Sequence, residues 1–504
     1  MTFLEFIVFL PLLAALAILV GAPARFTALA AAVVNAVAVF LVAIRFGESV
    51  LESPTPTFME SSRELLASPK LSLAFGIDGL SLVLAILTVI VTVAAVLASP
   101  VESKIKGSKK LYYVSSLLIS AGALGAFLST DLFFFYAFHE LALIPTFLMI
   151  GIFGHGEKRK QTAWTITIYL GVGSLILLAG LLALFFSAGA NSFAFADLYG
   201  AVNTTDGNPI AGETQQWIFL LLLVGFGILI SLFPFHSWAP AAYADAPTPV
   251  SMLHAGVLKK FGLYGLIRVA MPLLPEGAAH WQTLLLVLLL GNIIIIGLIT
   301  IAQRRLDTML GYSSVMHMGY VFLGIASGNS IGWSGAALLM FAHGISIALL
   351  FALNGSLRER IGSLEFDAIR GGLAKKAPAL GLLFGFAAFA SIGLPGFANF
   401  ASEVLVFFGG FKDMGDSLGA LQWATIIALW GVVISAVYML RAYRNVFKGP
   451  LADVDANASW TDLTAVEKAP VILLLVALMV VGFMPNLLLM FVSPVMESLT
   501  LFGR

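Results

Sequence analysis

Long apolar runs follow one another along the whole sequence, and each is about as long as the hydrocarbon core of a bilayer is thick. Of the 504 residues, 60% are hydrophobic and 11% are charged, whereas a soluble domain carries about 25% charged residues. A membrane β-barrel would instead show alternating segments of about ten residues. The sequence therefore predicts an all-α polytopic membrane protein with about fourteen transmembrane helices.

The apolar runs and their flanking residues place these helices along the chain. They are expected at residues 3–22, 25–44, 77–98, 111–129, 131–153, 161–187, 216–235, 248–272, 282–302, 309–327, 331–355, 377–411, 421–446 and 469–491. The twelfth is too long for one regular helix and contains Leu394-Pro395-Gly396, so a break within the membrane is expected there. The seventh ends in a proline-rich stretch, 231–251, and a break is expected there too.

The two expected breaks suggest an internal repeat. Helices four to eight (111–273) and nine to thirteen (282–447) form two blocks of five, each with its broken helix in fourth place. Such a pattern is typical of inverted repeats in transporters, whose ion sites lie near the breaks. Residues 1–110 would then be an N-terminal three-helix segment, and 448–504 would carry a C-terminal helix.

Charge and cysteine content limit the classes of function that the chain can have. The formal net charge is zero, so the sequence has no basic footprint for nucleic acid, and the chain has no cysteine for a thiolate-bound cluster. Most lysines and arginines outside the helices lie in the loops after the odd-numbered helices. The positive-inside rule then predicts a multi-pass protein of the bacterial inner membrane with both termini in the periplasm. The first apolar run has no basic n-region and carries Glu5, so we interpret it as a membrane helix rather than a signal peptide.

Titratable residues occur inside several predicted helices, where a charge costs at least about 2.5–3.5 kcal/mol. They are Glu140 on the fifth helix, Lys259 and Lys260 on the eighth, His317 on the tenth, His343 on the eleventh and Glu403 on the twelfth. Arg268, near the end of the eighth, is expected to extend toward the membrane surface. Burial and neighbouring charges move such pKa values toward neutrality, which suits proton transfer.

Each residue also has a structural interpretation. Either histidine alone would serve as an interhelical hydrogen bonder, and Glu140 as a paired carboxylate between helices. Five helices that each contribute a titratable group favour a relay over this alternative.

The sequence also resembles a known family, the antiporter-like subunit M (chain 4) of NADH:quinone oxidoreductase, respiratory complex I, which is related to subunits of multi-subunit Na⁺/H⁺ antiporters. The matching stretches are FGIDGLSL (75–82), FHELALIP (138–145), FPFHSWAPAAYADAPTPVSMLHAGVLKKFGLYGLIR (233–268), GYSSVMHMGYVFLGI (311–325), FAHGISIALLFALNG (341–355) and SIGLPGFANFASEVL (391–405).

The resemblance implies a role for each residue. Glu140 matches the family's fifth-helix glutamate, a switchable charge, and Lys260 matches the central lysine. His317 and His343 match the relay histidines, and Glu403 matches the glutamate on the proton exit side.

The sequence departs from the family pattern around the seventh helix. The family's lysine there, the partner of the glutamate, is replaced by Leu229. Lys259 or His236 is the candidate substitute partner for Glu140; otherwise the cytoplasmic half-channel works differently or is impaired.

The resemblance implies a translocase subunit with no redox centre of its own. NADH, FMN, iron–sulfur clusters and quinone would be bound by partner subunits, and sister antiporter-like subunits would be its neighbours in the bilayer. No metal ligand set is expected in this chain. The alternatives are a cation/proton antiporter subunit and a structural membrane-arm subunit with an impaired channel.

Overall fold

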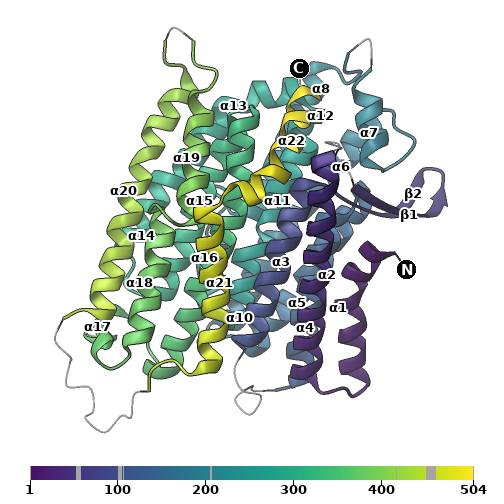
Figure 1. The fold of residues 1–504 in the computed structure, drawn as a ribbon. Coiled ribbons are helices and arrows are strands. Elements are labelled where there is room, and N and C mark those ends of the chain that lie inside the picture. Colours follow the sequence, from purple (N-terminus) through teal and green to yellow (C-terminus); the bar gives the residue numbers. More distant parts are fainter. Residues whose placement is uncertain are drawn as a thin grey trace.

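The computed structural model of the chain is a bundle of long helices that run roughly side by side (Figure 1). It describes residues 2–52, 58–99, 105, 107–204, 207–369, 371–415, 417–449 and 461–502. Within these ranges, 12 helices are long and apolar enough to cross a membrane. The predicted class, a helical polytopic membrane protein, is confirmed, while the count of fourteen stays a prediction.

Most membrane-length helices run without interruption. They are α1 (Phe3–Val20), α2 (Ala24–Glu52), α3 (Gly79–Leu97), α4 (Lys109–Leu128), α5 (Leu132–Phe153), α6 (Arg159–Ser187), α8 (Gly212–Ile230), α15 (Leu306–Ala326), α16 (Ser330–Ile361), α20 (Ala420–Phe447) and α21 (Ala465–Phe483). One more consists of α13 (Pro275–Leu290), the π-helical turn η4 (Gly291–Ile296) and α14 (Gly297–Ala302). It begins earlier than the expected residue 282, because Pro275 is a favourable first helical residue.

The predicted eighth helix is interrupted twice by π-helical turns. It consists of α10 (Thr248–Leu253), η2 (His254–Leu258), α11 (Lys260–Gly265), η3 (Leu266–Ala270) and α12 (Met271–Leu273). A π turn changes the backbone hydrogen-bonding register, and such turns are frequent at functional sites. One of the two, η2, ends two residues before Lys260.

Both expected helix breaks are present. α8 ends at Ile230, its capping residue Ser231 has a left-handed φ of 69°, and α9 (Trp238–Asp245) follows after a turn. α18 (Pro378–Ile392) ends at Gly393 with a φ of 83°, and α19 (Ala398–Phe411) follows. The inverted repeat and the domain boundaries inferred from these breaks stay predictions.

At the first break, backbone N–H and C=O groups that have lost their helical partners form hydrogen bonds with side chains. The Asn292 side chain, fully buried on η4, accepts from the Phe233 N–H at 2.6 Å and donates to the Ser231 carbonyl at 3.2 Å. The Trp238 indole N–H donates to the Ile228 carbonyl at 3.0 Å. Irregular backbone at membrane depth requires such partners, because lipid provides none.

Residues 58–77 form a β-hairpin that the sequence analysis did not foresee. β1 (Phe58–Ala67) pairs antiparallel with β2 (Lys70–Ile77) at one side of the bundle (Figure 1). The Asp131 carboxylate, which caps the start of α5, also accepts from the Ser72 N–H at 3.3 Å. Burial raises the pKa of Asp131. The hairpin is therefore joined to α5 by a buried hydrogen bond.

The expected last helix, residues 469–491, is wrong as one element. α21 ends at Phe483, and α22 (Asn486–Phe502) begins after Pro485. Proline has no N–H and disfavours a helical conformation in the residue before it, and Met484 has a non-helical φ of −131°. Three shorter elements complete the fold. They are α7 (Phe195–Val202), α17 (Phe366–Ile369) and the 3₁₀ turn η5 (Leu373–Lys375).

Burial separates central from outer helices. In the most apolar 18-residue stretch of α16, 100% of the residues are buried, and in that of α15 the share is 94%. In the corresponding stretch of α21 it is 33%. The central helices carry both predicted relay histidines. These side chains are therefore shielded from lipid by the surrounding helices.

Candidate functional site

Lys260 lies at the centre of the candidate site. It is the first residue of α11, separated from the π turn η2 only by Lys259, and its side chain is fully buried. The ammonium nitrogen donates to the Ala255 carbonyl at 2.7 Å. That carbonyl lies inside η2, where α-helical hydrogen bonding is interrupted, so it is available to a side-chain donor. The π turn therefore positions the lysine.

The structure brings the two predicted relay histidines to Lys260. Its ammonium nitrogen lies 3.0 Å from Nδ1 of His343 on α16. The His343 ring centroid lies 5.6 Å from that of His317 on α15. Lys260, His343 and His317 thus form a buried row across three elements.

The His317 ring lies between two backbone carbonyls. Its Nδ1 is 2.8 Å from the Ser313 carbonyl, and its Nε2 is 2.9 Å from the Ser391 carbonyl at the end of α18. A neutral imidazole has one N–H to donate, and an imidazolium has two. The site therefore accepts a proton on either ring nitrogen, one of which faces the second helix break.

Glu403 lies at that second break. Its side chain is 5% exposed, and its Oε2 packs against Gly393, where a β-carbon would collide with it. Among the residues that the structure describes, its Oε1 has no hydrogen-bond partner. One turn earlier, Asn399 donates to the Ser346 hydroxyl at 3.4 Å, which donates to the His343 carbonyl at 3.2 Å. Polar groups thus connect the histidine helix with the glutamate helix.

Glu140 lies apart from this row, on α5 facing α6. It accepts a hydrogen bond from the Ser174 hydroxyl, whose oxygen lies 3.1 Å from the Tyr136 hydroxyl. Its Oε1 is 3.5 Å from Nδ1 of His139, an ion-pair distance when the imidazole is protonated. The Glu140 side chain is 36% exposed, so it lies near the outer surface of this single chain.

The two substitute partners proposed for Glu140 do not pair with it directly. The Lys259 nitrogen lies 5.1 Å from the centroid of the Tyr243 ring. His236 stacks on Phe233, with 5.8 Å between the ring centroids. In the described part of the chain, neither forms an ion pair with Glu140, and a longer-range coupling of Glu140 with Lys259 stays a prediction.

Arg268 corrects one expectation, because it does not extend to the membrane surface. It is 9% exposed and forms an ion pair with Asp78, which is 3% exposed and caps the start of α3. Its guanidinium also lies over the Tyr264 ring, 5.4 Å from the centroid. Two buried charges that neutralise each other cost less than either charge alone. Arg268 thus joins η3 to α3.

Breaking this ion pair should destabilise the fold strongly. Asp78→Asn preserves a helix-capping side chain but leaves Arg268 as an unpaired buried cation, a loss of about 3–5 kcal/mol. Arg268→Met in the same chain removes that cation and should recover part of the loss. The measurement is thermal unfolding of the purified subunit complex for the wild type, both single variants and the double variant. Additive losses in the double variant would contradict the pairing.

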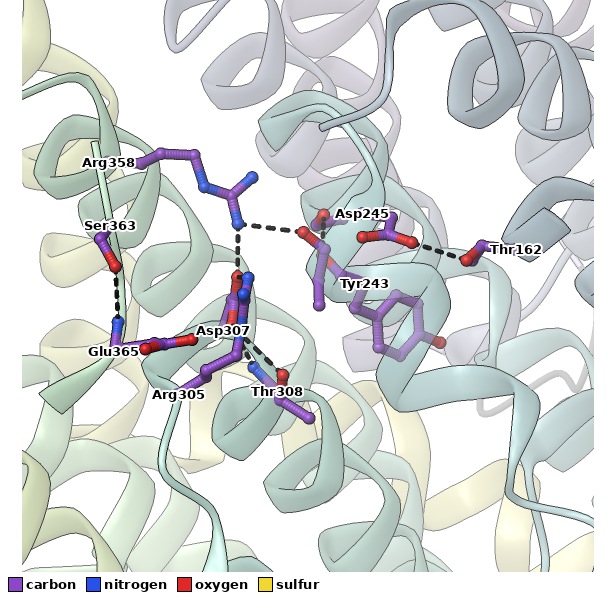
Figure 2. A network of polar contacts seen from close by, with 11 residues as sticks. Thr162, Tyr243, Asp245, Arg305, Asp307, Thr308, Arg358, Ser363 and Glu365 are labelled. Carbon is purple, nitrogen blue, oxygen red and sulfur yellow. Dashed lines mark hydrogen bonds and ion pairs between the residues drawn. The ribbon is translucent and has the colours of Figure 1, made fainter. Parts of the chain in front are cut away.

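A polar network joins the ends of several helices (Figure 2). Arg358 donates to the fully buried Asp307 at 2.7 Å and to the Ala244 carbonyl at 3.0 Å. Arg305 donates to the same carboxylate at 2.9 Å. On the other side of α9, Asp245 accepts from the Thr162 hydroxyl at 2.6 Å. The network joins α15, α16, α9 and α6.

This network borders a cavity of about 1210 Å³. Five arginines line it: Arg25, Arg159, Arg305, Arg358 and Arg360. They belong to the loops after the odd-numbered helices that the sequence predicts, or to the helix ends beside those loops. These loops therefore converge at one end of the bundle. His155 also lines the cavity; burial and then the charge of Arg358 lower its pKa to about 4, so it is neutral at pH 7. The cavity is a charged recess beside α9, lined by these arginines and by Asp245, Glu359 and Glu467.

Two glycines allow the Lys260 helix to approach the His343 helix. A β-carbon at Gly344 would lie 2.6 Å from the Gly256 carbonyl oxygen, and one at Gly256 would lie 2.9 Å from the Gly344 carbonyl oxygen. Small residues at helix interfaces permit such contact. The close approach supports the 3.0 Å contact between Lys260 and His343.

Gly344→Ala should therefore weaken the site without removing any titratable group. We expect overpacking to cost about 1–3 kcal/mol and to separate the Lys260 and His343 side chains. The amount of assembled complex and the rate of proton transport measure the two effects. Wild-type transport by an assembled Gly344→Ala variant would show that the close approach is dispensable.

Three buried polar residues with clear contacts were missing from the sequence-based site. Asp78 neutralises Arg268, Asn292 bonds the first break, and the His254 Nδ1 lies 3.2 Å from the Tyr243 hydroxyl. Each interrupts an apolar run, and this interruption is the signal in the sequence that could have pointed to these residues. The partners of Asp78 and Asn292 are 190 and 59 residues away, so the sequence alone could not pair them.

Fold and site together define the class of protein: a polytopic membrane protein whose interior carries a row of titratable side chains leading to a broken helix. Groups of three or more candidate metal ligands are absent from the residues described.

Comparison with known proteins places the chain within that class. Residues 129–435 match the family model described as NADH:quinone oxidoreductase/Mrp antiporter, TM, and the chain belongs to this family. It is 37% identical over 421 residues to NAD(P)H-quinone oxidoreductase chain 4 1 of Synechococcus elongatus, covering 83% of this chain and 76% of that relative. It is 32% identical to NADH-quinone oxidoreductase subunit M of Rhodobacter capsulatus, over 97% of this chain and 95% of the relative. A chain of respiratory complex I from Thermus thermophilus with bound NADH has the same fold, with a TM-score of 0.87 and 30% identity over 99% of this chain and 100% of that one.

Proposed function

We propose that this chain is a proton-translocating membrane-arm subunit of an NADH:quinone oxidoreductase, in which quinone reduction drives proton transport. The observation that carries the proposal is the buried row of Lys260, His343 and His317 ending beside Glu403 at a broken helix. Titratable groups at membrane depth mark ion pathways. The relatives named as oxidoreductase subunits supply the complex.

Each residue has a role in this proposal. Lys260 holds the proton in the middle of the membrane and passes it toward His343 and His317. Glu403 releases it on the far side. Glu140 is the switchable charge: its bond to Ser174, which also contacts Tyr136, holds the carboxylate in place, and His139 is a close titratable neighbour.

The remaining parts of the reaction belong to partners. We propose that other subunits bind NADH, FMN, iron–sulfur clusters and quinone, because this chain has no cysteine and belongs to a family of transmembrane subunits. Sister antiporter-like subunits would lie beside it in the bilayer. The arginines around the cavity support an orientation in the bacterial inner membrane with this end in the cytoplasm and both termini in the periplasm.

The complex that contains this chain tests the proposal in proteoliposomes. NADH and a quinone should drive proton uptake into the vesicles, and Glu140→Gln should lower it while the complex stays assembled. Proton uptake unchanged by Glu140→Gln would favour a structural membrane-arm subunit with an impaired channel.

A second candidate function is a cation/proton antiporter subunit, because the family model includes Mrp antiporters. An imposed sodium gradient would then drive proton movement without NADH. Proton movement that requires NADH and is unaffected by sodium would exclude this alternative. The neighbouring genes also separate the two functions, because complex I subunits and antiporter subunits are encoded in different gene clusters.

A further inference from the structure

Three titratable side chains lie between the cavity and Lys260 without a role in the row described above. They are Tyr243 on α9, His254 on η2 and Lys259 at the end of η2. All are buried, with exposed fractions of 2%, 3% and 1%. Buried ionisable groups are costly, so a cluster of them requires an explanation.

Tyr243 contacts both of the other side chains. The Tyr243 hydroxyl is 3.2 Å from Nδ1 of His254. The Lys259 nitrogen lies 5.1 Å from the centroid of the Tyr243 ring. Within the described ranges, neither that nitrogen nor Nε2 of His254 has a hydrogen-bond partner. A structural lysine or histidine would be bonded on those atoms, so both are free to bind a proton or water.

One end of this cluster adjoins the cavity. The residues that directly follow Tyr243, Ala244 and Asp245, line the cavity, as do Pro247 and Thr248 at the start of α10. Figure 2 shows Tyr243 beside Asp245 and the Arg358 network. In the sequence, the cluster is therefore one residue away from the lining of a polar recess at the arginine-rich end of the bundle.

The other end adjoins the central lysine. Lys259 precedes Lys260, whose ammonium contacts His343. The neighbouring Phe261 stacks on His139, with 3.9 Å between ring centroids, and His139 lies 3.5 Å from Glu140. Lys259 is thus the member of the cluster that is next to the relay in the sequence. Leu229 on α8 stands at the position of the family's seventh-helix lysine. It is buried, and its side chain cannot bind a proton.

We propose that Tyr243, His254 and Lys259 form a proton-uptake arm that carries protons from the arginine-lined cavity to Lys260. The inference rests on the proposed proton-translocating function, and it assigns proton uptake to residues of α9 and of the segment that begins at η2, because Leu229 on α8 cannot titrate. The proton moves from the cavity to the imidazole of His254 beside the Tyr243 hydroxyl, then to the Lys259 amine and on to Lys260. No covalent bond between heavy atoms forms or breaks.

Two substitutions test the arm in the assembled complex. His254→Gln retains a polar side chain for Tyr243 but cannot titrate, and Lys259→Met retains an unbranched side chain without the amine. Each should lower NADH-driven proton uptake on the order of 10²-fold, the lower end of the range for loss of a proton-transfer group. The double variant should be no worse than either single variant, because the residues act in series.

Control variants separate this arm from the proposed function. Ser314→Ala removes a buried hydroxyl on α15 that also has no hydrogen-bond partner among the described residues, and it should pump normally. Loss of pumping in Lys260→Ala with wild-type pumping in both arm variants would overturn the arm alone. Wild-type pumping in Lys260→Ala would overturn the proposed function and the arm with it.

A gentler substitution decides the case in which the two variants fail to assemble. Tyr243→Phe removes one hydroxyl and retains the ring that packs against Trp238 and His254. We expect slower proton uptake at an unchanged amount of complex. Uptake at the wild-type rate in that variant would overturn the arm.

Discussion

Lys260→Ala should lower the proton flux through this subunit on the order of 10²-fold, the scale of a lost proton-transfer group. The ammonium is fully buried, contacts His343 at 3.0 Å and is held by a carbonyl inside a π turn. Alanine leaves no group there that can hold a proton. Proton uptake by proteoliposomes that contain the complex measures the loss, and NADH oxidation should fall with it where the two are tightly coupled.

Two further lysine variants separate titration from charge. Lys260→Arg retains a cation, but arginine stays protonated in proteins, so it should fail to pump like the alanine variant. Lys412→Ala removes an exposed lysine at the end of α19 and should pump normally. Normal pumping by Lys260→Ala would remove Lys260 from the pathway.

The helix positions could be predicted from the sequence because hydropathy dictates them. The run at 131–153 became α5 at Leu132–Phe153, and both breaks lie where proline interrupts an apolar run. These features depend on local residues alone. The hairpin at 58–77 was missed because its strands are stabilised by contacts with helix ends elsewhere, such as the bond from Ser72 to Asp131.

The candidate site was predicted in part. Lys260, His343 and His317 were expected together, and the structure places them in one row. Helical spacing shows which residues share a face but not which helix that face meets. The partner of Arg268 is Asp78, separated from it by 190 residues, and only the packing of η3 on the start of α3 reveals that pair. The π turns were also hidden, since no residue type marks them.

Glu403→Gln should lower the proton flux on the order of 10²-fold, whereas Glu403→Asp should retain a larger share of it. The Glu403 carboxylate packs against Gly393 at the second break, and its Oε1 has no hydrogen-bond partner among the described residues. Glutamine has the same shape but cannot release a proton. Aspartate can, although it is one methylene shorter and lies farther from the break.

The comparison of these two variants isolates titration from packing. A packing role would make glutamine the milder change because it preserves the volume, and aspartate the more harmful one because it opens a cavity. A proton-exit role predicts the reverse order. Glu213→Gln, an exposed carboxylate in the first turn of α8, is the matched control and should pump normally. Proteoliposome uptake that is equal for the wild type and Glu403→Gln would make Glu403 a packing residue, and the pathway would then leave the His317 ring by another route.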